Sequence, residues 1–217
     1  MTVIIIPGFT GYPEEVTFKG LDKILSQQSH AVVKIAWPYF PKELDKYCFT
    51  NTITYVRNKL ERMKSDDLII LGFSMGGIIA TMLATEFEVK KLGLIVSPYQ
   101  AGSEDDLGGK YRDWKKTGYR IVNSSKFGAL NIPFSFIEDA RKYNALQLIS
   151  QVSCPKLFIA GERDMKIPLK VSKKLFDLAN EPKEWHQIPG MEHKYQYQPE
   201  MLDIVNKIII NFIGSKN

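Results

Sequence analysis

Cysteine and histidine are scarce in this chain of 217 residues, which has two of the first and three of the second. Cys48 and Cys154 are far apart and follow no metal-binding or redox spacing, so neither a disulfide scaffold nor a zinc site is expected. No apolar run approaches the roughly 20 residues of a membrane-spanning helix. The start of the chain lacks the basic region of a secretion signal, and its first apolar run stops at Pro7-Gly8. We therefore expect a cytoplasmic protein without membrane insertion.

An excess of charge of one sign is also missing. The 29 Lys and Arg exceed the 24 Asp and Glu by five, and the basic residues are scattered among acidic ones. Without a basic stripe or a nucleic-acid-reading motif, no nucleic-acid partner is expected. An apolar fraction of 44% over this length is typical of one globular domain, and it leaves the oligomeric state unknown.

What the chain does contain is an alternation of short β-branched runs with longer segments of helical period. This order predicts an α/β fold with a mostly parallel six-stranded sheet and helices on both faces. The expected strands are Val3–Ile6, Ala31–Ile35, Leu68–Leu71, Leu92–Val96, Lys156–Ala160 and Lys183–Ile188. The expected helices are Glu14–Gln28, Asn51–Met63, Gly76–Glu86, Leu169–Leu178 and Pro199–Phe212.

The alternation stops between Val96 and about Asn144, in a stretch rich in Gly, Ser, Tyr and Trp. We interpret residues 98–144 as a cap or lid inserted into a core of residues 1–97 and 145–217, because a long insertion in a compact domain is usually functional. The alternative is a poorly packed loop. The aromatic residues of the insertion favour burial against the core.

The most informative segment is Gly72-Phe73-Ser74-Met75-Gly76, a G-x-S-x-G motif between an apolar strand and a helix of small residues. Glycines on either side of the serine permit the tight strand-to-helix turn that exposes its hydroxyl. Ser74 is therefore the predicted nucleophile. The alternative is a glycine-rich turn that only lets helix and sheet approach closely.

A serine nucleophile needs a base, and the base needs a carboxylate to orient it. His193 follows the last expected strand in a loop, where parallel sheets place their chemistry, whereas His186 falls inside that strand and His30 precedes the nucleophile. Asp164 stands at the tip of the turn after the fifth expected strand. Its alternatives are Glu162 as the carboxylate, or a role for Asp164 as a helix cap.

The developing oxyanion needs two donors, and we expect the backbone N–H groups of Met75 and Phe9 to supply them. The alternative for the loop at Gly8 is an ordinary strand-ending turn. Met165, Met191 and the cap aromatic Tyr99 are the expected substrate contacts, in an apolar acyl pocket. The chemistry requires no cofactor and no metal.

The segments Pro7-Gly8-Phe9, Gly72 to Gly77, Gly161 to Asp164 and Gly190 to His193 make the chain resemble the α/β-hydrolase superfamily. The resemblance covers nearly all of the chain except the insertion. Two departures are the lack of an extra antiparallel strand pair at the start, and Pro7 where many relatives have a histidine that braces the oxyanion loop. The cap position and the stretch Leu157 to Asp164 are similar to carboxylesterases of the cinnamoyl-esterase and monoacylglycerol-lipase kind.

These residues together predict a serine hydrolase that cleaves carboxylic esters of a small-molecule acyl substrate through an acyl-enzyme. A thioesterase or an amidase with the same triad is an alternative, because the motifs do not specify the bond. A further alternative is a hydrolase-like fold used only for binding. Fold alone does not decide among them.

Overall fold

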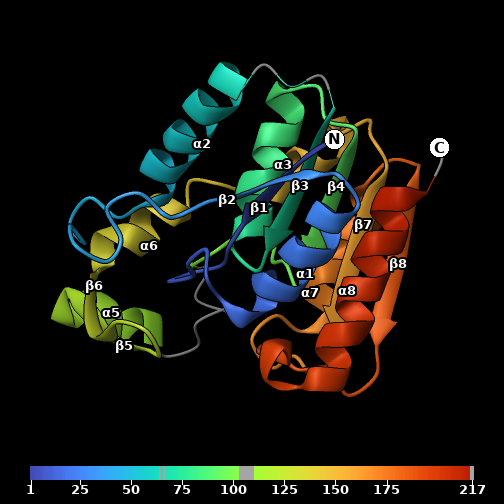
Figure 1. The fold of residues 1–217 in the computed structure, drawn as a ribbon. Helices are drawn as coiled ribbons and strands as arrows, with labels where there is room; N and C mark the ends of the chain where they lie inside the picture. The colour runs from blue at the N-terminus through green and yellow to red at the C-terminus, as the bar shows by residue number, and fades with distance from the viewer. Residues whose placement is uncertain (64, 66, 103–109, 216–217) are drawn as a thin grey trace.

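Six strands form one sheet in the computed structural model, which describes residues 1–63, 65, 67–102 and 110–215 (Figure 1). The strand order is β2-β1-β3-β4-β7-β8, and every neighbouring pair is parallel. The predicted fold class is therefore confirmed. The strands are β1 (Thr2–Ile6), β2 (Ala31–Lys34), β3 (Leu68–Phe73), β4 (Lys91–Ile95), β7 (Lys156–Gly161) and β8 (Lys183–Ile188).

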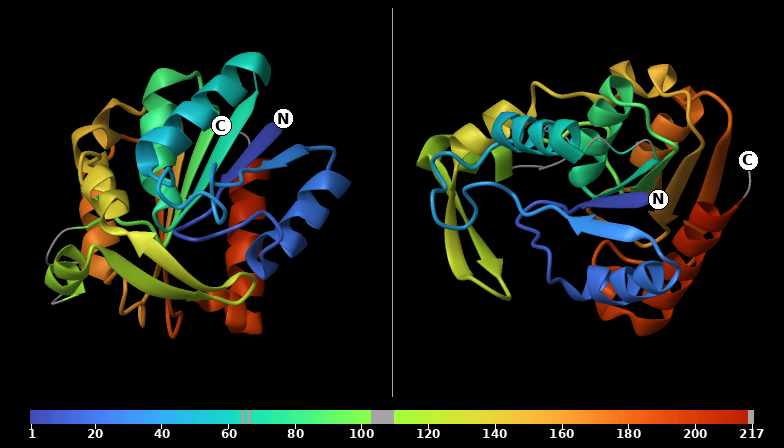
Figure 2. Two further views of the ribbon diagram at one scale, coloured as in Figure 1. Left: turned by 90° about the vertical axis from the view of Figure 1, so that its left-hand side faces the viewer. Right: turned by 45° about the horizontal axis from the view of Figure 1, so that its top comes forward.

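Helices cover both faces of the sheet, as Figures 1 and 2 show. One core contains side chains of α1 (Val16–Gln27) and α8 (Pro199–Gly214). The other contains side chains of α2 (Phe49–Met63), α3 (Gly76–Glu86) and α7 (Leu169–Leu178). Ile4 and Ile6 enter one core while Val3 and Ile5 enter the other, because successive strand residues point to opposite faces.

Lysine side chains cap the carboxyl ends of two of these helices by donating hydrogen bonds to their last carbonyl groups. The Lys91 ammonium, at the start of β4, donates to the carbonyls of Phe212 and Ser215 at the end of α8, at 2.6 and 2.7 Å. Lys183, at the start of β8, donates to two carbonyls at the end of α7. Burial lowers the pKa of Lys91, and the carbonyls compensate the buried charge. Lys91 and Lys183 therefore cap helix ends, a role that the sequence pattern does not predict.

The expected insertion contains regular structure that its sequence did not predict. It consists of α5 (Lys110–Thr117), a hairpin of β5 (Tyr119–Ser124) and β6 (Gly128–Pro133), and α6 (Phe134–Ala140). Figure 2 shows the hairpin apart from the main sheet. Residues 103–109 of the expected cap lie outside the described residues. Short 3₁₀ turns follow at Ala145–Gln147 and Ile149–Gln151, and a third, η3, spans Tyr195–Tyr197.

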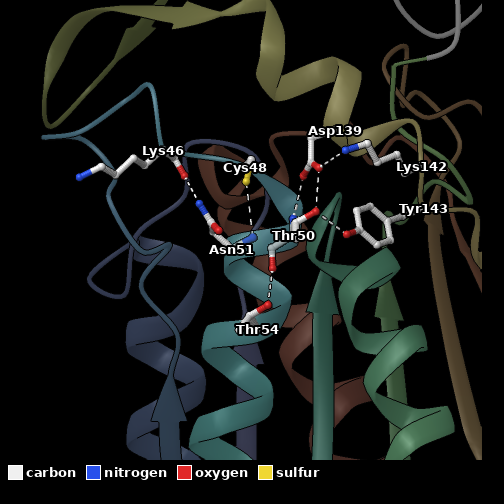
Figure 3. Close-up of polar contacts among 8 residues, drawn as sticks. All are labelled: Lys46, Cys48, Thr50, Asn51, Thr54, Asp139, Lys142 and Tyr143. Atoms are coloured by element: carbon white, nitrogen blue, oxygen red, sulfur yellow. Dashed lines mark hydrogen bonds and ion pairs between the residues drawn. The ribbon is translucent and has the colours of Figure 1, made fainter.

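A buried carboxylate joins α6 of the insertion to the start of α2 (Figure 3). Asp139 accepts hydrogen bonds from the Thr50 amide and the Thr50 hydroxyl, both at 2.7 Å, and pairs with Lys142 at 3.0 Å. Burial alone would raise the pKa of Asp139, but these partners outweigh it and lower the pKa. The first N–H groups of a helix have no acceptor within the helix. The Asp139 carboxylate accepts from one of them at the start of α2, although the two residues are about 90 positions apart in the sequence.

Candidate active site

Ser74 lies on the turn that joins β3 to α3, in a strained backbone conformation with φ +50°. Its neighbours are held by close contacts that only glycine allows. A Cβ on Gly76 would approach the Ile6 carbonyl to 2.3 Å, and one on Gly72 would approach the Gly77 Cα to 2.4 Å. The turn therefore packs directly on the sheet, and the hydroxyl is carried beyond the strand ends.

Three side chains from separate loops form one hydrogen-bonded chain. Ser74 Oγ lies 3.0 Å from His193 Nε2, and His193 Nδ1 lies 2.8 Å from Asp164 Oδ2. A carboxylate only accepts hydrogen bonds, so Nδ1 carries the proton and the Nε2 lone pair faces the serine. The Asp164 side chain is fully buried and the His193 side chain is 17% exposed. This arrangement fits a serine whose proton is removed by a neighbouring base.

The turn that carries Asp164 is packed against the loop that carries His193. A Cβ on Gly161 would approach the Met191 carbonyl to 2.3 Å, and the same carbonyl accepts from the Arg163 amide at 3.0 Å. The second carboxylate oxygen of Asp164 accepts from two backbone amides of its own turn, each at 2.8 Å. Backbone contacts therefore fix the acid and the base relative to each other.

The alternative residues lie elsewhere. Glu162 is exposed and accepts a 3.4 Å hydrogen bond from the Gly190 amide. His186 lies within the edge strand β8 and faces Glu184 at 3.4 Å. His30 precedes β2, at the end of the sheet opposite Ser74. Of the candidates for base and acid, the structure brings only His193 and Asp164 to Ser74.

The loop after β1 approaches the serine closely. A Cβ on Gly8 would meet the Ser74 Cβ at 2.9 Å. The Thr10 amide donates to the hydroxyl of Tyr47 at 3.0 Å, and Tyr47 is fully buried. The Phe9 ring packs against Phe136 of the insertion with ring centroids 4.8 Å apart. Buried aromatic side chains thus hold the loop that carries the Phe9 amide.

A cavity of about 710 Å³ opens beside Ser74 and His193. Its lining includes the apolar side chains of Phe9, Met75 and the 90% exposed Met165, together with many polar side chains. Besides Ser74 and His193, the polar lining residues are Thr10, Tyr12, Glu15, Thr17, Gln100, Arg120, Asn123, Ser124, Ser125, Lys166, Lys194, Tyr195, Gln196 and Tyr197.

Two expected substrate contacts do not line this cavity within the described part of the chain. Met191 is fully buried, with its side chain against Gly161. Tyr99 packs on the core, with the Lys174 ammonium 5.5 Å from its ring centroid. Both follow a strand end, as a cavity residue would, but Met191 is buried and Tyr99 packs against the core instead. Sequence position therefore placed them near the site without fixing their direction.

The hairpin of the insertion covers part of the cavity and is fastened to the core at its tip. Residues of β5 and the following turn belong to the cavity lining. Lys126 pairs with Glu14 at 2.6 Å and lies 4.6 Å from the Tyr12 ring centroid. Phe127 packs edge-on against Tyr12 with ring centroids 5.5 Å apart. The hairpin therefore lines part of the cavity and also contacts the segment before α1.

A family model described as serine hydrolase (FSH1) matches residues 10–195, a range that includes the three hydrogen-bonded side chains. This chain belongs to the FSH1 serine hydrolase family. An uncharacterised protein of Escherichia coli O157:H7, YfhR, is 38% identical over 74 residues, which are 34% of this chain and 26% of that protein.

Solved structures resemble the FSH1-family chain over nearly its whole length. Mouse alpha/beta hydrolase domain-containing protein 10 matches with a TM-score of 0.80 and 18% identity, covering 98% of this chain and 89% of that one. Est1E from Butyrivibrio proteoclasticus, solved with ferulic acid, gives 0.77 and 17% over 98% and 87%. The esterase EaEST from Exiguobacterium antarcticum gives 0.79 and 13% over 99% and 92%. At these identities the likeness establishes the α/β-hydrolase fold.

Sequence reasoning missed several residues that shape the site of this FSH1-family chain. Tyr47 supports the loop of Phe9, and Ser97 donates to the Ser74 carbonyl at 3.2 Å. Ser97 follows β4, and its position at a strand end was an available signal; Tyr47 precedes α2 and had none.

In the part of the chain that is described, no helix combines the length and apolarity needed to cross a bilayer.

Proposed function

We propose that this FSH1-family protein hydrolyses carboxylic esters, with Ser74 as nucleophile, His193 as general base and Asp164 as the acid that orients the histidine. The observation that carries the proposal is the pair of hydrogen bonds, at 3.0 and 2.8 Å, that link the three side chains. Esterases among the structures of similar fold support the choice of an ester bond. The scarcity of cysteine supports the accompanying proposal that it acts in the cytoplasm.

In the first half of the reaction, Ser74 Oγ attacks the ester carbonyl as His193 Nε2 takes its proton. The amides of Phe9 and Met75 then donate to the oxyanion, which lies beside the Gly8 loop and the start of α3. Among the described residues neither amide is engaged by another backbone carbonyl, which leaves both available. The intermediate collapses by expelling the alcohol, which receives the proton from His193.

In the second half, a water molecule gives its proton to His193 Nε2 and attacks the acyl-serine. The second tetrahedral intermediate expels Ser74, which regains the proton, and the carboxylic acid leaves. Throughout, Asp164 holds the histidine in the tautomer with the proton on Nδ1. Each step uses only groups of this chain, water and the ester.

The direct test is labelling by a fluorophosphonate probe, followed by turnover of a panel of p-nitrophenyl esters of increasing acyl length. Wild-type protein is expected to be labelled at Ser74 and to release nitrophenol, whereas Ser74→Ala removes both signals. Ser26→Ala, at an exposed position on α1, is the matched control and should retain both. Full ester turnover in Ser74→Ala would refute the proposal. Parallel assays with acyl-CoA and peptide-amide substrates test the thioester and amide alternatives.

A further inference from the structure

The cavity beside the catalytic serine carries an excess of positive charge. Besides the catalytic histidine, three cations line it, Arg120, Lys166 and Lys194. Glu15 is the one carboxyl found in its lining among the described residues. The whole chain is far closer to balance, with 29 basic residues against 24 acidic ones. We call the three cations the basic lining. Charges of one sign in a cleft raise the local concentration of ligands of the opposite sign.

The Glu15 carboxyl offsets part of this charge on one side. It accepts a hydrogen bond from the Tyr12 amide at 3.2 Å. Burial raises the pKa of Glu15, and the nearby Lys194 ammonium opposes that shift. Glu15 and Lys194 therefore compensate each other in part, and the positive charge contributed by Arg120 is left over.

Arg120 lies on the face of β5 that lines the cavity. Half-buried and exposed residues alternate along this strand, because successive side chains point to opposite faces. The half-buried Arg120, Val122 and Ser124 all line the cavity. The exposed Tyr119 and Ile121 do not. The alternation thus places the Arg120 side chain on the cavity side of the hairpin.

The Arg120 guanidinium has an aromatic partner but no acidic one. Its Cζ lies 5.7 Å from the ring centroid of Trp114, which is 2% exposed and donates to the Ile132 carbonyl at 3.0 Å. Within the described residues, no carboxylate pairs with the guanidinium. A guanidinium held over a ring keeps the N–H groups of its edge available, and two of them match the two oxygens of a carboxylate. A half-buried cation without a counter-ion is stabilised when such an anion binds.

We propose that the basic lining binds a carboxylate on the substrate, with Arg120 as the main contact, so that the enzyme prefers esters that carry an ionised carboxyl group besides the ester. Monoesters of dicarboxylic acids and esters of hydroxy acids are substrates of this class. Arg120 donates two hydrogen bonds to the carboxylate, and the two lysines add attraction over a longer distance. The inference rests on the proposed ester hydrolysis and specifies its substrate class.

The test compares esters of nearly equal size that differ in charge, each carboxylic acid with its primary amide. Monoethyl succinate, glutarate and adipate place the carboxylate on the acyl part. The butyrate esters of glycolic, 3-hydroxypropanoic and 4-hydroxybutanoic acid place it on the alcohol part. For at least one pair, kcat/KM of wild-type protein is expected to be about tenfold higher for the acid, as one charge-assisted hydrogen bond predicts. Raising NaCl from about 0.05 to about 0.5 M should reduce this ratio, because dissolved ions screen the attraction.

Variants of the arginine test its part in this preference. Arg120→Gln should lower kcat/KM of the preferred acid by about tenfold and that of its amide much less. Arg120→Lys keeps the charge but not the planar fork, so it should lose only part of the ratio. Arg112→Gln, exposed on α5 and outside the cavity lining, is the matched control and should leave the ratio unchanged.

Several results would overturn the inference. One is an acid-to-amide ratio of one or less for all six pairs in an active wild-type enzyme, and another is an equal loss on acid and amide in folded Arg120→Gln. If Arg120→Gln does not fold, Arg120→Lys and the salt series decide, and a ratio that responds to neither contradicts the basic lining. If wild-type protein hydrolyses no ester, charged or neutral, the proposed function itself fails.

Discussion

Asp164 uses its two carboxylate oxygens for different tasks. Oδ1 accepts from the amides of Lys166 and Ile167, and Oδ2 accepts from His193. The first pair of hydrogen bonds holds the turn, and the last sets the tautomer of the histidine. A substitution that separates these tasks therefore tests the role of the carboxylate without removing the turn.

We predict that Asp164→Asn lowers kcat by about a thousandfold or more while the protein stays folded. The asparagine oxygen still accepts from the two amides, but its NH₂ group then faces Nδ1 and favours the tautomer with the proton on Nε2. That proton occupies the lone pair that Ser74 needs. Steady-state turnover of a p-nitrophenyl ester, with circular dichroism as the folding check, measures the effect. Glu162→Gln is the matched control, and its kcat should stay within about twofold of wild type. A large loss of kcat in Glu162→Gln but not in Asp164→Asn would identify Glu162 as the acid.

Glu15 gives a prediction about pH and stability. Because burial raises its folded-state pKa, the protonated form is favoured on folding, and the stability it contributes is present below the ordinary value of 4.5 and lost as pH rises through the folded-state pKa. Glu15→Gln cannot ionise, so it should unfold at a higher urea concentration than wild type at about pH 7.5. Near pH 4 the two midpoints should converge. A constant difference between the two urea midpoints across this pH range would contradict a raised pKa of Glu15.

At the residue scale, the sequence could predict that Ser74, Asp164 and His193 lie together, because each follows an expected strand of the parallel sheet. Parallel strands end at one edge of the sheet, so residues that follow them are brought together whatever their separation in the chain. Tyr47 could not be found in this way, since it reaches the Phe9 loop from an irregular segment 37 residues from Thr10. Met191 and Tyr99 show that a strand end fixes the position of a residue but not the direction of its side chain.

At the scale of elements, the four inner strands of the main sheet were predictable because they are buried on both faces and contain apolar runs. The edge strands β2 and β8 are partly exposed. β5 alternates exposed and half-buried residues and includes Arg120 and Asn123, so its sequence is typical of a loop. α6 has only seven residues, too few to show a helical period. Short elements that depend on contacts with distant segments were the ones missed.

The contact of α6 with α2 gives a prediction about these elements. Asp139→Ala should lower the free energy of unfolding by about 1–2 kcal/mol, because it removes the group that caps the start of α2. Urea unfolding followed by circular dichroism measures this loss. Glu138→Ala, exposed on the same helix, is the control and should change stability little. Equal stability of the two variants would show that Thr50 finds another partner.

At the scale of the whole molecule, the insertion shares its core with the sheet. Trp114, Ile132 and Phe136 of the insertion belong to the same buried cluster as Ile6 of β1 and Ile70 of β3. The insertion expected from the sequence, residues 98–144, therefore does not have a hydrophobic core separate from that of the sheet. Since a shared core couples the parts energetically, they are expected to unfold together.

We predict a single unfolding transition with the same midpoint by tryptophan fluorescence and by circular dichroism. Trp114 reports on the insertion, and Trp37 and Trp185 report on the rest. Phe136→Ala should lower the stability of the whole protein by about 3–5 kcal/mol, because the ring is fully buried between Trp37, Tyr47 and Phe9. Tyr119→Ala, half-exposed on β5, is the control. Two separate transitions, with only the first shifted by Phe136→Ala, would make the insertion an independent domain.

The pairing of Lys126 with Glu14 has a consequence for the medium in which the protein works. Both side chains are exposed at the tip of the hairpin, and dissolved ions weaken an attraction of this kind. The side chains of Ser74, His193 and Asp164 are joined by short, largely buried hydrogen bonds that ions hardly reach. A rise in ionic strength is therefore expected to weaken the contact at the tip of the hairpin much more than the hydrogen bonds beside the cavity.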